Sequence, residues 1–273
     1  MDGKADLHLH TTFSDGALTP HDLLVNAARA GLTILSITDH DNTGALNEAV
    51  GLGATMGIEV IAGVELSTTV DAQDIHLLGY FIDRENEMLQ EHLAIFRSER
   101  RRRAERIVEK LHHLRLPLPF EAVLSRAGTA SIGRPHIAAA LVEEGLVDNY
   151  QAAFARYLGF GKPAYERKYQ VPPRDAIRMV ADAGGLSFVA HPGNAIDERV
   201  LLALIKEGVD GIEVVHPSHS RERMAYYRGI AEEYFLLTSG GSDFHGGRRN
   251  DLDVLGRFSI PADAVEMMRR RLR

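Results

Sequence analysis

The chain of 273 residues contains no cysteine and no tryptophan. The lack of cysteine excludes disulfides, thiolate zinc sites and a cysteine nucleophile. No apolar run approaches the ~20 residues that a membrane-spanning helix needs. The first residues also lack the apolar segment of a signal peptide. We therefore expect a cytoplasmic protein that does not enter a membrane.

Basic residues are fewer than acidic ones, 31 against 38, so the formal net charge is −7. Such a chain as a whole does not attract polyanions, so we expect no binding of long nucleic acid. The composition is 45% apolar and 25% charged, which is ordinary for a globular protein. At this length a folded chain buries roughly 70–75% of the surface that its unfolded form exposes, which allows one large core. The unusual abundance is histidine, with 13 residues.

Short β-branched runs alternate with longer helical patterns, which is typical of an α/β fold. The predicted strands are 6–10, 33–38, 59–65, 75–82, 186–190, 211–215 and 235–239, and the predicted helices between them include 20–30, 44–56, 174–183, 199–207 and 221–233. From 85 to 169 there is no convincing strand, and a long helix is predicted over 87–114. We therefore predict an α/β body made of 1–84 and 170–273, with an all-helical insertion, or lid subdomain, at 85–169.

Candidate ligands for a metal ion fall where the predicted strands end. The first strand ends in Asp6-Leu7-His8-Leu9-His10, and alternation along a strand places His8 and His10 on one face. Two imidazoles so placed can share a metal ion. A half-exposed strand end explains the same pattern, and Asp15, which precedes a glycine, is also typical of a plain turn.

The next strands end in the same kind of residue. The second runs into Thr38-Asp39-His40-Asp41, and Glu65 closes the third. The segment after Glu65 reads as a hairpin with its tip near Val70 and Asp71, which predicts that Glu65 and His76 lie directly opposite each other. In isolation, His76 is explained equally well as a satisfied histidine of the core.

The later strands complete the pattern. The strand at 186–190 leads into His191, and the strand at 235–239 leads into Ser242-Asp243-Phe244-His245. Asp243 and His245 share a face if the backbone there is extended. Each motif alone is ordinary, but together they gather six histidines and three carboxylates where α/β folds build their sites.

These motifs, in this order from residue 6 to residue 245, resemble those of the PHP (polymerase and histidinol phosphatase) family. The resemblance implies a distorted (β/α)7 TIM-like barrel with a trinuclear metal site at its mouth. It assigns the first metal ion to His8, His10, Glu65 and Asp243, the second to Glu65, His76 and His191, and the third to Asp15, His40 and His245. Asp6 and Asp39 are candidates for orienting these ligands, or are plain turn and strand-end residues.

Within that family, short motifs of this chain resemble the branch that acts on nucleotides. They are Arg100-x-x-Arg103-Ala104, Gly133-Arg134-x-His136, Gly161-Lys162-Pro163-x-Tyr165 and Ser218-His219-Ser220. The resemblance makes Arg134 and Lys162 candidate phosphate ligands, although both are equally explained as surface charge. His219 is a candidate acid or phosphate ligand, or an inert neighbour of a helix start.

Arg100 is a further candidate for binding substrate. Along the long helix, an apolar stripe includes Leu89, Leu93, Phe96, Ile107, Leu111 and Leu114. Arg100 falls in the middle of this stripe and Arg103 at its edge. A guanidinium there needs a partner, which is either a carboxylate such as Glu143 or Glu144, or the phosphate of a substrate.

The implied ligand set is imidazole and carboxylate, which suits Mn²⁺, Fe²⁺ or Zn²⁺. Three such ions bring a charge of +6 and three carboxylates return −3, so the site favours a bridging hydroxide and a dianionic phosphate. We therefore expect a phosphoric ester hydrolase that uses a metal-bridged hydroxide. The expected substrates are small nucleotides: AMP, 3′,5′-bisphosphates such as pAp, or short 5′-phosphorylated oligoribonucleotides. The alternatives are another small-molecule phosphatase, such as a histidinol-phosphate phosphatase, and a non-catalytic metal-holding PHP module.

Overall fold

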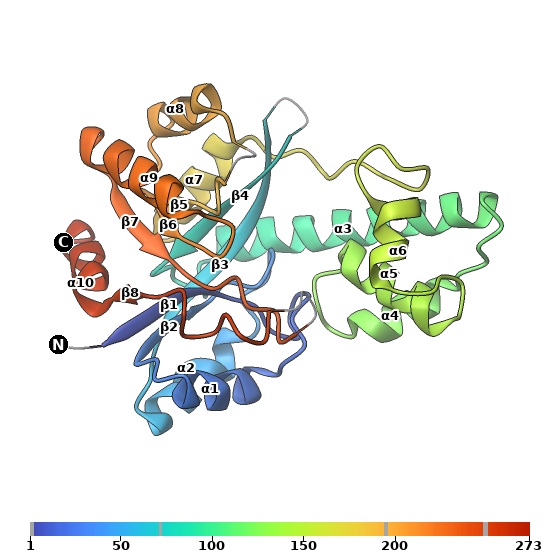
Figure 1. Cartoon of the computed structure of the whole chain (residues 1–273), viewed down its shortest axis with the longest axis horizontal. Coiled ribbons are helices and arrows are strands. Elements are labelled where there is room, and N and C mark those ends of the chain that lie inside the picture. The colour runs from blue at the N-terminus through green and yellow to red at the C-terminus, as the bar shows by residue number, and fades with distance from the viewer. Residues whose placement is uncertain (1–2, 71–72, 194–195, 248–250) are drawn as a thin grey trace. The chain divides into compact units, whose positions relative to one another are not determined.

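A computed structural model describes residues 3–70, 73–193, 196–247 and 251–273 of the chain (Figure 1). The chain divides into two compact units. The first, here called the barrel unit, consists of Met1–Glu91 and Gln170–Arg273, and the second, the helical unit, is His92–Tyr169. The sequence predicted the insertion at 85–169.

The barrel unit is built around one eight-stranded sheet in the order β7-β6-β5-β4-β3-β2-β1-β8. The strands are β1 (Lys4–Leu9), β2 (Ile34–Ile37), β3 (Glu59–Val70), β4 (Gln73–Tyr80), β5 (Leu186–Val189), β6 (Gly211–Val215), β7 (Leu237–Gly240) and β8 (Ile260–Pro261). Just beyond β7, Phe244 bridges to Leu9 of β1 and accepts a hydrogen bond from the N–H of His10 at 3.0 Å. The sheet therefore nearly closes, and the predicted barrel-like α/β fold is confirmed.

Helices cover this sheet, with α1 and α2 beside β1 to β3 and α7, α8 and α9 beside β4 to β7 (Figure 1). Their starts follow from local capping. The side chains of Thr19, Asp197 and Ser220 accept hydrogen bonds from the main-chain N–H three residues later. The helices are α1 (Pro20–Arg29), α2 (Leu46–Met56), α7 (Pro173–Asp182), α8 (Glu198–Lys206), α9 (Arg221–Glu233) and α10 (Ala262–Arg271). The sequence prediction missed β8 and α10.

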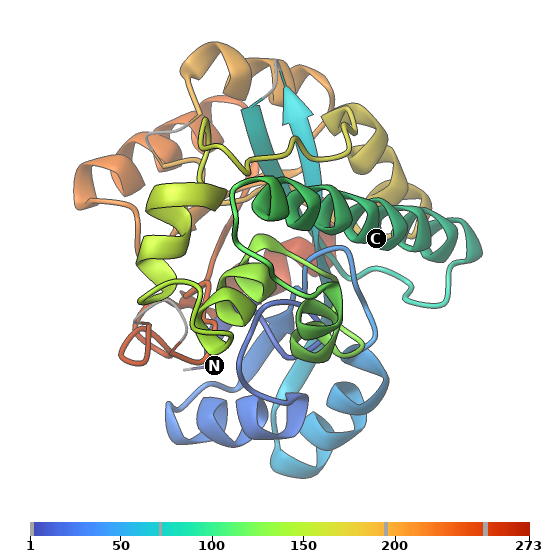
Figure 2. The same cartoon turned by 90° about the vertical axis from the view of Figure 1, so that its right-hand side faces the viewer.

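The hairpin of β3 and β4 is longer than the sequence predicted, and its register differs. Val70 pairs with Gln73, so His76 lies opposite Ser67, and Glu65 lies opposite Leu78. The prediction that Glu65 faces His76 directly is therefore wrong by two residues. An even shift keeps both side chains on one face of the hairpin, because side chains alternate with a period of two. Figure 2 shows β3 as a long arrow.

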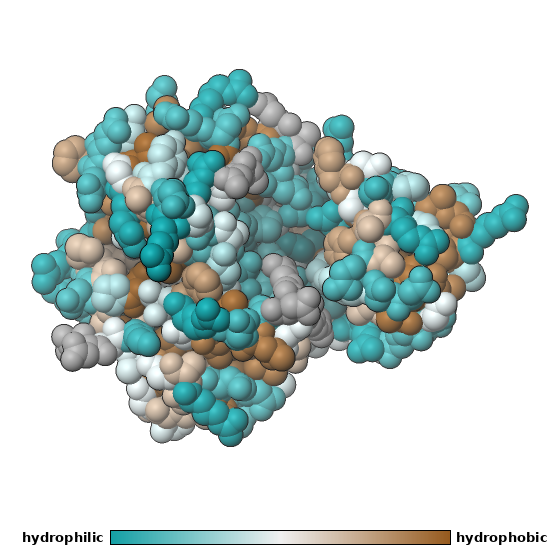
Figure 3. Space-filling view, in the orientation of Figure 1, coloured by the Kyte–Doolittle hydropathy of each residue, from teal (hydrophilic) through white to brown (hydrophobic). Residues whose placement is uncertain are grey.

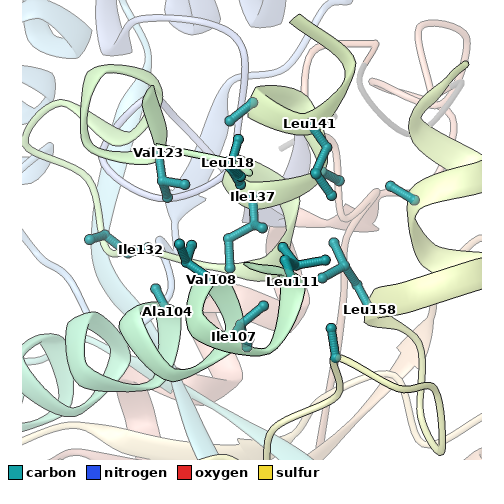
Figure 4. Close-up of a cluster of buried hydrophobic side chains, with 14 of the residues drawn as sticks. Ala104, Ile107, Val108, Leu111, Leu118, Val123, Ile132, Ile137, Leu141 and Leu158 are labelled. Carbon is teal, nitrogen blue, oxygen red and sulfur yellow. The ribbon is translucent and has the colours of Figure 1, made fainter. Parts of the chain in front are cut away.

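The helical unit has its own apolar core, which includes Val108 and Leu111 of α3, Val123 of α4 and Ile137 of α5 (Figure 4). Its elements are most of α3 (Glu87–His113), α4 (Phe120–Ala127), α5 (Arg134–Glu143), α6 (Tyr150–Ala153) and a π-helical turn (Phe154–Leu158). Leu114, expected in the apolar stripe of α3, lies just past the helix end and is exposed.

Hydrophilic and hydrophobic side chains are interspersed over the visible surface of each unit (Figure 3). Among the described residues, no helix is both long enough and apolar enough to cross a membrane.

Candidate metal centre

His8 of β1 and His10, which follows the strand directly, reach one carboxylate. His8 and His10 are fully buried, and their Nε2 atoms lie 3.4 and 3.2 Å from Oδ1 of Asp243. The two residues therefore present their side chains to the same side of β1, as the alternation of the strand predicted. Asp243 comes from the loop after β7, which the near-closure of the sheet brings beside β1.

Glu65 of β3 lies at the centre of the cluster. Its Oε1 is 2.6 Å from Nδ1 of His76 and 3.0 Å from Nε2 of His191. Its Oε2 is 2.9 Å from Nδ1 of His40, and the Nε2 atoms of His10 and His8 lie at 3.3 and 3.5 Å. One carboxylate thus faces five imidazoles. Burial opposes ionisation, but His40, His76 and His8 outweigh it and hold the pKa of Glu65 well below its usual value.

Asp15 defines a third group of donors. Its Oδ1 lies 3.3 Å from Nε2 of His245 and 3.7 Å from Nε2 of His40. The rings of His10 and His245 stack with their centroids 4.1 Å apart. All nine residues predicted as metal ligands therefore lie in one contiguous cluster of the barrel unit.

The backbone around the cluster is strained at three residues. Asp41, His191 and Asp243 have φ angles of 49°, 24° and 49°, which side chains with a Cβ rarely adopt. The expectation that Asp243 and His245 share a face of extended backbone is wrong. A turn brings them together instead, and Nδ1 of His245 lies 2.6 Å from the main-chain oxygen of Asp243.

Two buried aspartates hold the loops that carry these residues. Asp39 accepts hydrogen bonds from the main chain and hydroxyl of Thr11 and from the hydroxyl of Ser14, at 2.5–2.8 Å. Asp6 accepts from the main-chain N–H of Ser242 at 3.0 Å, and burial raises the pKa of Asp6 to about 7. Both predicted supporting residues thus contact the main chain beside the cluster.

The sequence analysis assigned no role to Glu213 or His216. Glu213 lies on β6 with no exposed surface and contacts Nδ1 of His8 at 2.9 Å. His216 follows β6, and its Nε2 lies 3.6 Å from Oδ2 of Asp243. A signal for Glu213 was available, because it is the one acidic residue inside the apolar strand 211–215.

His219 is placed differently from its predicted role. It is buried, its Nδ1 lies 2.8 Å from the main-chain oxygen of Val214, and its Nε2 accepts from the N–H of Gly193 at 2.9 Å. Because Nε2 accepts from an N–H and Nδ1 faces a carbonyl oxygen, the ring proton lies on Nδ1. Burial lowers the pKa of His219. Both nitrogens are thus engaged by the main chain, which speaks against the predicted role as an acid.

Of the two candidate phosphate ligands in the helical unit, Arg134 has partners inside that unit. The guanidinium of Arg134 lies over the rings of Phe154 and Tyr165 and donates to the main-chain oxygen of Leu158 at 3.2 Å. Lys162 is exposed.

The expected burial of the two arginines on α3 is reversed. Arg103 is buried, and its Nε donates to the main-chain oxygen of Glu166 at 2.9 Å. Arg100 is half-buried. Glu143, offered as a partner for Arg100, pairs with Arg126 instead.

The donor set of the barrel unit fits bound metal ions. Several groups of imidazole nitrogens and carboxylate oxygens lie within 4.8 Å of one another. The Nε2 atoms of His8, His216 and His245 are buried and make no hydrogen bond to any described residue. Buried polar atoms are normally satisfied, so this convergence indicates a cation among them.

Comparison with known proteins agrees with this chemistry. The chain is 34% identical to a 3′,5′-nucleoside bisphosphate phosphatase of Chromobacterium violaceum, over 94% of this chain and 92% of that one. It is 33% identical to a 5′-3′ exoribonuclease of Haemophilus influenzae, over 90% of this chain and 91% of that one. Among solved structures, a putative metal-dependent phosphoesterase from Bifidobacterium adolescentis superposes with a TM-score of 0.91 and 32% identity, covering 98% of this chain and 96% of that one.

The PHP domain pattern matches residues 6–235, most of the chain. This match and the relatives of similar length support the same assignment as the buried cluster of imidazoles and carboxylates. The chain therefore belongs to the PHP domain family and is a phosphoesterase.

Proposed function

We propose that this protein hydrolyses phosphate esters of small nucleotides: AMP, 3′,5′-bisphosphates such as pAp, or short 5′-phosphorylated oligoribonucleotides. The observation that carries the proposal is the contact of the Glu65 carboxylate with five imidazoles inside the barrel unit. The relatives named as a bisphosphate phosphatase and an exoribonuclease support the nucleotide class.

The proposed site holds three divalent ions of Mn, Fe or Zn. The ligands proposed for the first are His8, His10, Glu65 and Asp243. Those for the second are Glu65, His76 and His191, and those for the third are Asp15, His40 and His245. The distances around Glu65, Asp243 and Asp15 support this division.

When bound, such ions lower the pKa of water towards ~7 and polarise phosphoryl oxygens. The chain's own residues supply the geometry. Glu65 presents one oxygen to His76 and His191 and the other to His8, His10 and His40, so it is proposed to be shared between ions. Asp39 and Asp6 hold the loops of Asp15 and Asp243 through main-chain hydrogen bonds.

Substrate recognition is proposed to include Arg100, Arg134 and Lys162 of the helical unit. Arg134 is the strongest candidate, because its guanidinium lies over the rings of Phe154 and Tyr165 and offers a planar fork that suits phosphate. His219 is retained only as a buried support of the Gly193 main chain.

The test is a phosphate-release screen with Mn²⁺. It compares AMP, pAp, 5′-phosphorylated dinucleotides and histidinol phosphate. We expect the highest kcat/KM with one of the nucleotides. Turnover of histidinol phosphate alone would replace the nucleotide class with the competing phosphatase, and no turnover by a fully metallated protein would favour a metal-holding module.

A further inference from the structure

Glu213 is a buried carboxylate between two of the proposed ligands. It lies in the middle of β6, where its neighbours Ile212 and Val214 are buried apolar residues. An ionised carboxylate in such a position is costly unless hydrogen-bond donors surround it. The hydrogen-bond partners of Glu213 therefore indicate its role.

Each oxygen of Glu213 has a different partner. Oε2 accepts a hydrogen bond from the main-chain N–H of His191 at 2.6 Å, and Oε1 lies 2.9 Å from Nδ1 of His8. His8 lies on β1 and His191 lies in the loop after β5, and the two are proposed ligands of different metal ions. The carboxylate of Glu213 therefore links the side chain of His8 to the main chain of His191.

The contact with His8 has a chemical consequence. A carboxylate only accepts, so Nδ1 of His8 must carry the proton that it donates. The lone pair used for metal binding is then on Nε2, the atom that faces Asp243 at 3.4 Å and Glu65 at 3.5 Å. Such a carboxylate–histidine pair fixes the tautomer and the orientation of a ligating ring.

The contact with His191 acts on the main chain. His191 has a φ of 24°, a conformation that persists only when its surroundings hold it. The loop is held further along as well, because Tyr227 donates to the oxygen of Gly193 at 2.6 Å and His219 accepts from its N–H. Glu213 is the member of this set that also contacts a proposed ligand of the first ion.

We propose that Glu213 is a positioning residue that sets the tautomer of His8 and the main-chain conformation of His191 together. The proposal rests on the metal ligands proposed above, but not on the nucleotide preference. It excludes Glu213 as a direct ligand in a group with His8 and His216, which the short distances would otherwise permit.

The substitution Glu213→Gln tests this, because glutamine has the same shape and only one side-chain oxygen. The N–H of His191 cannot become an acceptor, so it takes that oxygen. The amide NH₂ then faces Nδ1 of His8, which can accept only if the ring proton moves to Nε2. In the variant, Nε2 of His8 should therefore carry the proton and have no lone pair for a metal ion, while the fold is retained.

The experiment measures Mn²⁺ binding by isothermal titration calorimetry, with elemental analysis of the purified protein. We expect Glu213→Gln to bind its weakest ion at least tenfold more weakly than the wild type. The matched control is Asp210→Asn just before the same strand, where Asp210 accepts from the N–H and hydroxyl of Ser187 at 2.8 and 3.1 Å. The control should leave Mn²⁺ affinity within twofold of the wild type.

If the variant does not fold, a measurement on the wild-type protein still tests the proposal. In the Zn²⁺-loaded protein, ¹⁵N NMR of the His8 ring should show a proton on Nδ1 and metal on Nε2. Metal on Nδ1 would overturn the proposal and make Glu213 a co-ligand. Wild-type Mn²⁺ affinity in a folded Glu213→Gln protein would overturn it equally. Neither result touches the nucleotide assignment, which the phosphate-release screen decides.

Discussion

The barrel unit buries a cluster of imidazoles and carboxylates besides its apolar core, whereas the helical unit buries almost only apolar side chains. In the barrel unit, imidazoles and carboxylates such as His8, His10, Glu65 and Glu213 have almost no exposed surface. In the helical unit, whose residues the structure describes throughout, the buried polar side chains are Arg103, Ser131 and His136. Most of its other buried side chains form one apolar cluster.

The comparison shows that burial serves two purposes in one chain. The apolar cluster stabilises its unit through removal of hydrocarbon from water. The buried charges of the barrel unit oppose folding unless they compensate one another, which they do at distances near 3 Å. Changes in the barrel cluster should therefore alter metal binding and catalysis, and changes in the apolar cluster should alter stability.

The largest effect on the barrel side is expected for Glu65→Gln. The substitution preserves volume but removes the charge that five imidazoles face. We expect loss of metal ions and a fall in kcat/KM of more than about 100-fold, beyond what most supporting residues cost. Elemental analysis and steady-state kinetics measure both. Full metal content in the purified variant would refute the shared-ligand role of Glu65.

The matching change in the helical unit is Leu111→Ala. Leu111 is fully buried in the apolar cluster, so its truncation leaves a cavity. We expect the free energy of unfolding to fall by about 2–5 kcal/mol, measured by urea denaturation, with unchanged metal content of the folded protein. Loss of metal ions from a still-folded variant would contradict the separation of roles drawn from the two units.

The substitution Arg100→Met tests whether a residue of the helical unit binds the substrate. If Arg100 binds substrate phosphate, kcat/KM should fall at least about tenfold, or 1.4 kcal/mol, with little change in melting temperature. Arg103→Met is the comparison, because Arg103 is buried and bonded to the main chain of Glu166. It should lower the melting temperature. A fall in melting temperature for Arg100→Met, with unchanged kinetics, would remove Arg100 from the substrate site.

The smallest effect is expected for Glu166→Gln on the surface of the helical unit. Glu166 contacts Lys110 at 2.6 Å and Arg106 at 3.0 Å. The pKa of Glu166 is lowered from its ordinary 4.5, mainly by the hydrogen bond from Lys110. A lowered folded-state pKa stabilises the protein above the unfolded value and ceases to do so as pH falls through the folded value. The variant should lose less than about 1 kcal/mol at pH 7.

Urea denaturation of wild type and variant across pH 7 to 3 checks this. The difference in unfolding free energy should shrink as the pH falls below 4.5. A difference that stays constant over that range would show that the ion pairs of Glu166 are not its source.

Much of the barrel was predictable because its signals are local. The strands at 33–38 and 211–215 stand out as β-branched runs between turn residues, and β6 matches its predicted range. The small errors arose where pairing set the length of a strand. β3 continues to Val70 because β4 supplies hydrogen-bond partners along its whole length. The C-terminal β8 has two residues, too few for a periodic pattern.

The sequence alone determined most of the residues that gather, because imidazoles and carboxylates at the ends of successive strands must meet at one edge of the sheet. Tertiary structure alone decided how they meet. The positive φ angles of His191 and Asp243 and the use of both oxygens of Glu65 depend on contacts between distant strands. The role of Glu213 depends on the same kind of contact, because its partners His8 and His191 are remote in sequence. Local patterns carry no record of such contacts, so hydrogen-bond partners and tautomers become defined only when the sheet closes.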